Sequence, residues 1–326
     1  MSVFVAEELS EVLNTKVVIG RINMGLLNRI IIDDVLLDDQ SGQEMLKVTR
    51  LSAKFDIMPF FKGKISISSV QLLGFNINLR KETPDSPPNF KFVLDAFASK
   101  DTVKKENSLD LRINSILIRR GRMSYHVLSE EETPGKFNAK HIQLQNIIAN
   151  ISLKALSKDS LNLGIKRLSL DEKASGFSLK KMSLKLVANN KQTNIDNFTI
   201  ELPETSLKLD TIHLEYDSLK AFDRFTEQVH FSFRTLPSQV TLKDISPFVP
   251  ILSHFKEPVT LDMEVKGTVD QLTCSHLEIT ADDRQFRLRG DVSLQDLSHP
   301  QDAYVYGTLS ELSANTRGVG FLVRNL

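Results

Sequence analysis

Cysteine is almost absent from this 326-residue chain, which has Cys274 alone and therefore no intrachain disulfide framework. An excess of one charge is absent too, because Lys plus Arg and Asp plus Glu both total 41. Nucleic-acid binders usually carry a basic excess that neutralises phosphates, so we expect no nucleic-acid partner. No apolar run approaches the roughly 20 residues of a membrane-spanning helix, so we expect no transmembrane span.

Recognisable active-site patterns are also missing. The histidines are scattered, at positions 126, 141, 213, 230, 254, 276 and 299. His276 lies beside Cys274, but two ligands do not make a zinc site. No G-x-S-x-G motif occurs, and GRINMG (20–25) lacks the rest of a phosphate loop. We therefore expect a non-enzyme with no catalytic, cofactor-binding or metal residues.

The charged clusters of this sequence are interpreted as turns and solvated loops. Asp33-Asp34, Asp38-Asp39 and Asp282-Asp283 are carboxylate pairs without a visible partner, and the last two pairs fall between strands, where Asp favours turns. The basic run 119–122 (RRGR) is read as a solvated hairpin turn, with a contact to an anionic lipid headgroup as the alternative.

Period-2 alternation of apolar residues dominates what is present. Helical patterns are confined to 5–13, 89–99, 219–229 and the proline-interrupted 244–255. Val5, Leu9, Val12 and Leu13 are expected to form the apolar stripe of the first helix. The sequence thus predicts a mostly-β fold with about four short helices.

Alternation slips by one residue at many places. In GKISISSVQLLGFNINL (63–79), Ile67 is followed by Val70 and Leu72 on the opposite parity. The resulting pattern, Φ-x-x-Φ-x-Φ with Φ apolar, recurs as IDDVLL (32–37), VTRLSA (48–53), ISSVQL (67–72), INSILI (113–118), AKHIQL (139–144), IKRLSL (165–170), LKKMSL (179–184), IDNFTI (195–200), LDTIHL (209–214) and CSHLEI (274–279). A β-bulge restores both halves of such a strand to one face; a tight corner between strands is the alternative.

Repetition of this kind favours stacked hairpins in a long array, with an ordinary β-sandwich as the alternative. We expect a helix at 1–14, a repetitive β-sheet at 15–242 with helical insertions near 89–99 and 219–229, and a helix followed by further sheet at 243–326. Aliphatic residues occupy one face of each predicted strand and polar residues the other. The helices are too few to cover the apolar face, which therefore curls over itself or lines a groove.

Two stretches resemble the TamB subgroup of the AsmA-like proteins. In the first 80 residues the matching elements are Val17–Gly20, Ile32–Val35, Asp39–Gly42, Met58-Pro59 and Lys62–Ile67, in the family's order. The second stretch, ISPFVPILSHFKEPVTLDMEVKGTVDQL, resembles the family's short helix, strand and K-G-x-V/L-D-x-L turn. The family's membrane anchor and C-terminal domain have no counterpart here, so we expect an N-terminal fragment.

This resemblance implies an elongated, twisted antiparallel sheet curled into a taco-like hydrophobic groove. It implies a periplasmic location, anchored to the inner membrane in the full-length protein, and a role in carrying phospholipid acyl chains to the outer membrane. An outer-membrane barrel protein is an expected partner, reached through the C-terminal part. Alternative functions are a periplasmic assembly factor that captures unfolded outer-membrane or secreted proteins by β-augmentation, and a structural β-solenoid.

The predicted groove-lining residues are the aliphatic and aromatic members of the repeats. They are Ile65, Ile67, Val70, Leu72, Ile113, Ile116, Ile118, Ile142, Leu144, Leu168, Leu170, Met182, Leu184, Phe198, Ile200, Ile212 and Leu214.

Overall fold

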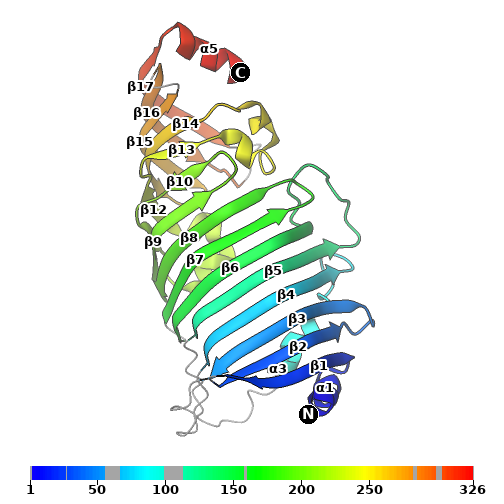
Figure 1. Cartoon of the computed structure of the whole chain (residues 1–326). Coiled ribbons are helices and arrows are strands. Elements are labelled where there is room, and N and C mark those ends of the chain that lie inside the picture. The colour runs from blue at the N-terminus through cyan, green and yellow to red at the C-terminus, as the bar shows by residue number, and fades with distance from the viewer. Residues whose placement is uncertain are drawn as a thin grey trace. The chain divides into compact units, whose positions relative to one another are not determined.

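All strands in the described part of the chain belong to one hydrogen-bonded sheet, as a computed structural model shows (Figure 1). The structure describes residues 2–26, 28–55, 67–98, 113–157, 160–281, 285–298 and 303–325. In this part of the chain the sheet has 17 strands, so the mostly-β prediction is confirmed and the β-sandwich alternative is wrong. The chain divides into two compact units, 1–154 with 167–178, and 155–166 with 179–326.

The first unit contains the first strands of the sheet and two helices. Its elements are α1 (Ser2–Leu13), β1 (Val17–Gly25), β2 (Arg29–Asp38), β3 (Glu44–Phe55), β4 (Ile67–Lys81), α3 (Lys91–Ala98) and β5 (Ile113–Val127). Strands β6 (His141–Ser157) and β7 (Ser160–Glu172) contribute residues to both units.

The second unit has shorter strands, several single-turn helices and one longer helix. They are β8 (Ser178–Asn189), β9 (Gln192–Glu201), β10 (Ser206–Lys208), β11 (Ile212–Glu215), η2 (Leu219–Arg224), α4 (Phe225–Gln228), β12 (His230–Arg234), β13 (Ser238–Val240), η3 (Leu242–Ile245), η4 (Pro250–His254), β14 (Val259–Gly267), β15 (Gln271–Ala281), β16 (Phe286–Gln295), β17 (Tyr304–Ala314) and α5 (Thr316–Asn325). Helix α5 has no counterpart in the sequence prediction.

The sheet is mixed, which corrects the expectation of an antiparallel one. Strands β4 and β5 run parallel, with Val70 opposite Ile116 and Leu72 opposite Ile118. A parallel pair needs a crossover between its strands, and the connection that contains α3 provides it. Other pairs among the described strands, such as β1–β2, β3–β4 and β15–β16, are antiparallel.

Phase slips in the first unit lie side by side on neighbouring strands. Each of β1–β4 reads Φ-x-Φ-x-x-Φ-x-Φ, and the x-x pairs face one another: Arg21 is opposite Asp33, Asp33 opposite Arg50, and Arg50 opposite Leu73. Left-handed backbone accompanies the slip at Asp34, Gly74, Arg120 and Asn146, with φ of 56°, 64°, 57° and 55°. Because all four strands slip at the same level, β1–β4 keep their pairing there without an extra residue. We call the line of x-x pairs across β1–β4, from Gly20-Arg21 through Asp33-Asp34 and Thr49-Arg50 to Leu73-Gly74, the slip seam.

Bulges account for several other repeats. An extra residue interrupts the ladder within ISSVQL and INSILI in the first unit, and within IDNFTI and CSHLEI in the second. Asn197 and His276 take the left-handed conformation at the last two bulges, with φ of 53° and 60°. The bulge prediction is therefore confirmed at these repeats.

Other repeats differ from the bulge prediction. IDDVLL and VTRLSA slip at the seam without an extra residue. AKHIQL is not a bulged strand, because Ala139 and Lys140 precede β6 in a turn. LDTIHL is the corner alternative, with Leu209 and Ile212 on either side of a break between β10 and β11. The run 119–122 lies inside β5, so the predicted hairpin turn is wrong.

Helices α1 and α3 cover part of one face of the sheet in the first unit. Ala6 of α1 packs with Val17, Ile19, Leu37 and Met45, and side chains around α3 border the same core. The predicted stripe of α1 is half wrong: Val5 and Leu13 pack on this core, whereas Leu9 and Val12 remain 39% and 46% exposed. In Figure 1, α3 lies behind the strands.

Candidate functional site

An apolar face is the feature of the first unit with the greatest functional potential. Cross-strand pairing arranges its side chains in rows that run from strand to strand. On one side of the slip seam are the covered rows, Val17–Leu37–Leu46–Ile77 and Ile19–Val35–Val48–Phe75. On the other side are the open rows, Ile22–Ile32–Leu51–Leu72–Ile118 and Ile30–Ala53–Val70–Ile116–Ile151.

The slip keeps both sets of rows on the same face. Regular alternation would send Val48 and Leu51, three positions apart, to opposite faces. Instead Leu51 packs against the cluster of Val48, Phe75 and Ile147. Leu72 and Ile118 pack against it as well, from β4 and β5. The apolar face is therefore continuous across the seam.

Burial differs between the two sets of rows. Val17, Ile19, Leu37, Val48 and Phe75 of the covered rows are between 5% and 9% exposed, whereas the other three covered-row residues are half-buried. The open-row residues are all half-buried. Those of the row that contains Val70 pack in none of the buried clusters. An apolar face that is closed at one end and partly exposed at the other can accept apolar molecules along the open rows.

Gly121 shows how tightly the covered part is packed. Gly121 takes the place in β5 beside Phe75, and a Cβ on it would lie 2.4 Å from two carbon atoms of the Phe75 ring. Only glycine leaves room for the ring at this level of the sheet. This fit is why the arginine-rich run 119–122 contains a buried residue in the middle of a strand.

Each predicted groove residue in the described part of the chain is half-buried, and Ile65 lies outside that part. The half-buried ones are Ile67, Val70, Leu72, Ile113, Ile116, Ile118, Ile142, Leu144, Leu168, Leu170, Met182, Leu184, Phe198, Ile200, Ile212 and Leu214. In the first unit Leu72, Ile118, Leu144 and Leu170 border one cluster, so four strands do bring their predicted side chains together. In the second unit Met182 pairs with Ile200 across β8 and β9.

Sequence reasoning missed the rows of β1 and part of β4. IGRINM (19–24) and LLGFNI (72–77) fit the Φ-x-x-Φ-x-Φ pattern and mark the seam, yet Ile22 and Phe75 were absent from the predicted lining. A search for the pattern in every register would have found both segments.

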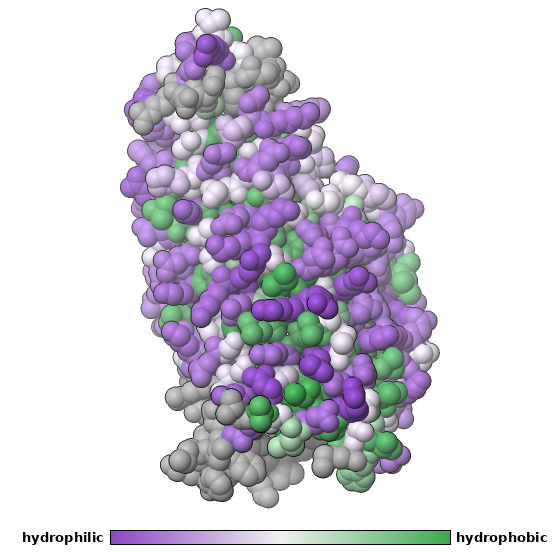
Figure 2. Space-filling view, viewed as in Figure 1, coloured by the Kyte–Doolittle hydropathy of each residue, from purple (hydrophilic) through white to green (hydrophobic). Residues whose placement is uncertain are grey.

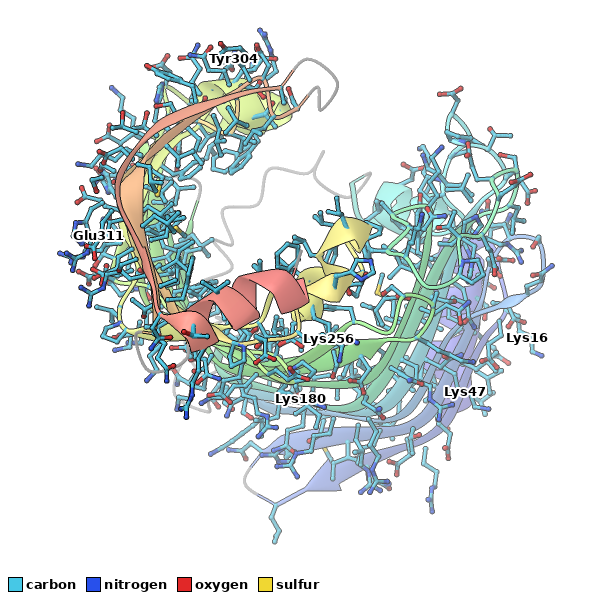
Figure 3. The ribbon with its side chains drawn as sticks, turned by 90° about the horizontal axis from the view of Figure 1, so that it is seen from above. Lys16, Lys47, Lys180, Lys256, Tyr304 and Glu311 are labelled. Atoms are coloured by element: carbon cyan, nitrogen blue, oxygen red, sulfur yellow. The ribbon has the colours of Figure 1, made fainter. Side chains whose placement is uncertain are left out.

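The opposite face of the first unit carries ion-paired side chains. Asp33 is 5% exposed and accepts hydrogen bonds from Arg50 Nε and Nη2 at 2.6 and 3.3 Å, with Arg21 at 4.0 Å. The hydrogen bond and charge of Arg50 lower the pKa of Asp33 despite its burial. Hydrophilic and hydrophobic residues alternate over these strands in Figure 2, and Lys47 lies on the outer side in Figure 3.

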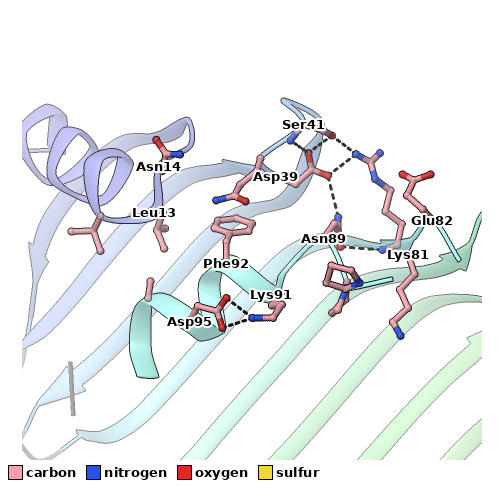
Figure 4. Close-up of a pocket in the computed structure, with 16 residues that line it drawn as sticks. Leu13, Asn14, Asp39, Ser41, Lys81, Glu82, Asn89, Lys91, Phe92 and Asp95 are labelled. Carbon is pink, nitrogen blue, oxygen red and sulfur yellow. Dashed lines mark hydrogen bonds and ion pairs between the residues drawn. The ribbon is translucent and has the colours of Figure 1, made fainter. Parts of the chain in front are cut away.

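A pocket of about 660 Å³ with a mixed polar and apolar lining lies between the end of α1, the β2–β3 turn and α3 (Figure 4). Asp39 dominates it, accepting hydrogen bonds from Ser41 and Asn89 and pairing with Arg80 at 2.7 Å. Burial opposes ionisation of Asp39, but hydrogen bonds led by that of Ser41 outweigh it, so its pKa lies below the ordinary value. This network locks the predicted Asp38-Asp39 turn and α3 in place, which gives the pocket a structural role. The pair Asp282-Asp283 lies outside the described residues.

Comparison with known proteins adds no identification. A scan against protein-family models matches none, and a search of the curated proteins finds no match. None of the helices in the described ranges is long and apolar enough to cross a membrane.

Proposed function

We propose that this chain is a lipid-conduit segment that carries phospholipid acyl chains along its apolar sheet face between the inner and outer membranes. The observation that carries the proposal is the pair of open rows, which present half-buried aliphatic side chains on strand after strand of one sheet. The sequence resemblance to the TamB subgroup supports a periplasmic location and this substrate class.

Repetition of the rows suits movement better than tight binding at one place. Burying one acyl CH₂ is worth roughly 0.8 kcal/mol, so a sixteen-carbon tail gains on the order of 10 kcal/mol with no headgroup site. Adjacent strands lie about 4.8 Å apart, so a tail passes from one aliphatic side chain to the next in short steps. Because Leu51, Leu72 and Ile118 are chemically alike, no step is strongly favoured.

Photocrosslinking from neighbouring positions of β4 tests this role. A photoreactive amino acid at Val70 faces the open rows, whereas the same residue at Gln71 points to the opposite face. We expect phospholipid adducts at Val70 and few at Gln71 when the full chain is isolated from a bacterial envelope. Mass spectrometry identifies the adducts. Equal labelling at the two positions, or none at Val70, would refute the conduit.

Strand capture by β17 is a second candidate function. In the described part of the chain β17 pairs only with β16, and its side chains Tyr304, Val305, Tyr306, Leu309 and Leu312 are each more than half exposed. A free edge of this kind can pair with an extended peptide, which is the assembly-factor hypothesis. Figure 3 shows Tyr304 on the outer side of the second unit. A crosslinker at Val305 that yields protein adducts, with no lipid adducts at Val70, would favour this function.

A further inference from the structure

Two histidines face each other at the end of the β5–β6 hairpin in the first unit. His126 and His141 are 15 positions apart, but they are direct cross-strand partners in the antiparallel ladder. Their midpoint falls at Thr133-Pro134, where Pro134 and Gly135 provide the turn chemistry. Directly opposed residues have Cβ atoms about 4.5–5.5 Å apart, so the hairpin alone brings the two imidazoles together.

Hydrogen bonding fixes the ring of His141. Its Nε2 lies 2.9 Å from the carbonyl oxygen of Glu130, so the Nε2–H donates to that oxygen. The neutral ring then has its lone pair on Nδ1, which lies 3.0 Å from Nδ1 of His126. A backbone carbonyl that holds the far nitrogen of a histidine is the usual partner of a metal-binding imidazole. His141 is 6% exposed, so this orientation is held by its surroundings.

A carboxylate completes the cluster. Glu132 Oε1 lies 4.0 Å from Nδ1 of His126, and its side chain is 62% exposed and therefore free to approach. The three ligand atoms lie within 4.8 Å of one another. Beside them is a cavity of about 200 Å³, lined by Glu132, His141, Asn138 and Gln143 among others, which gives solvent access to the site. Lys140 Nζ lies 2.7 Å from Glu130 Oε2. This lysine therefore pairs with Glu130 and does not neutralise Glu132.

We propose that His126, His141 and Glu132 bind a divalent transition metal, with Zn²⁺ as the best fit. Two zinc–nitrogen bonds of about 2.0–2.1 Å at a tetrahedral angle place their nitrogens about 3.3 Å apart, close to the separation of the two Nδ1 atoms. Two imidazoles and one carboxylate are zinc ligands, and water from the cavity takes the fourth position. The bound ion ties the loop 128–140 to the ends of β5 and β6.

Isothermal titration of the untagged, chelator-treated full chain with zinc chloride tests the site. We expect one zinc ion per chain in the wild type and about 100-fold weaker binding in His126→Gln, because two ligands remain. Glu132→Gln changes an exposed side chain that does not support the fold. We expect the affinity of this variant for zinc to fall about tenfold. His254→Gln, an exposed histidine in the second unit, is the matched control and keeps wild-type affinity.

Two results would overturn the proposal. One is a wild-type chain that binds no zinc at micromolar concentration; the other is zinc binding unchanged by both His126→Gln and Glu132→Gln. Circular dichroism of each variant checks that the sheet is intact. If His126→Gln fails to fold, Glu132→Gln and the visible spectrum of the cobalt-substituted wild type decide, since four-coordinate cobalt bound by imidazole gives intense bands that hexa-aquo cobalt lacks. Lipid crosslinking at Val70 does not depend on this site, so the two proposals fail separately.

Discussion

Placing the same charge at two valines of one sheet separates an open apolar face from a dry core. Val48 of β3 belongs to the covered rows and is 5% exposed, whereas Val70 of β4 belongs to the open rows and is half-buried. Both lie in inner strands of the first unit and face the same side. Val70→Asp and Val48→Asp are therefore matched in chemistry and differ in burial.

The expected costs follow from that difference. At Val70, losing the partial burial of a valine costs about 1–2 kcal/mol, and the lower β-propensity of Asp adds about 1 kcal/mol. At Val48, the full burial of about 2 kcal/mol is lost, and an unpaired carboxylate next to Phe75 and Val35 adds several kcal/mol more. The second sum is comparable to the total stability of about 5–15 kcal/mol of an ordinary domain.

Urea unfolding followed by circular dichroism measures both variants. We expect Val70→Asp to fold with a lowered midpoint and an unchanged slope, and Val48→Asp to be largely unfolded without urea. Val70→Asp should also abolish lipid adducts from a photoreactive residue at Ile116, its neighbour in the same open row, because a charge there opposes an acyl chain. Equal destabilisation by the two variants would mean that Val70 lies in a dry core, and the conduit would lose its structural basis.

Further predictions concern the packing and the buried carboxylates. Gly121→Ala should lower stability by about 1–3 kcal/mol, because its Cβ meets the Phe75 ring; adding Phe75→Leu should recover part of the loss, and additive costs in this double-mutant cycle would contradict the contact. Glu172 is 2% exposed and accepts backbone hydrogen bonds from Gln143, Ala174 and Ser175. Burial alone would raise the pKa of Glu172. These bonds and the one from the Ser175 hydroxyl lower that pKa by more than burial raises it, so the pKa lies below the ordinary 4.5. Its stabilisation is thus complete above pH 4.5 and lost as the pH falls through the lower folded-state pKa. Glu172→Gln should cost about 2 kcal/mol at neutral pH and converge with the wild type in acid; a constant difference in urea midpoint at all pH values would refute this assignment.

Local patterns predicted much of this fold because parity along a strand is a local property. The slip between Leu72 and Phe75 is visible in the sequence, and Gly74 between them takes the left-handed conformation that accompanies the return of both to one face. The bulges at Asn197 and His276 follow the same logic, and asparagine and histidine tolerate positive φ better than most residues.

The pairing of strands far apart in the sequence could not be predicted, for a physical reason. No local pattern near ISSVQL or INSILI indicates that β4 and β5 run parallel, because the relative direction of two strands depends on the path of the connection between them. The buried position of Gly121 depends on Phe75, a residue of another strand. The pairing of His126 with His141 could have been predicted, since their midpoint falls at Thr133-Pro134 within the turn, but the hairpin had to be recognised first.

The slip seam has a consequence for how such a chain can change its size. A one-residue insertion in β2 or β3 would shift that strand's parity against both neighbours, so strand length is fixed collectively. A duplicated hairpin, in contrast, would bring its own slip with it and match the level of the strand beside it. Sheets of this design can therefore widen by gene duplication strand pair by strand pair, while their depth stays constant.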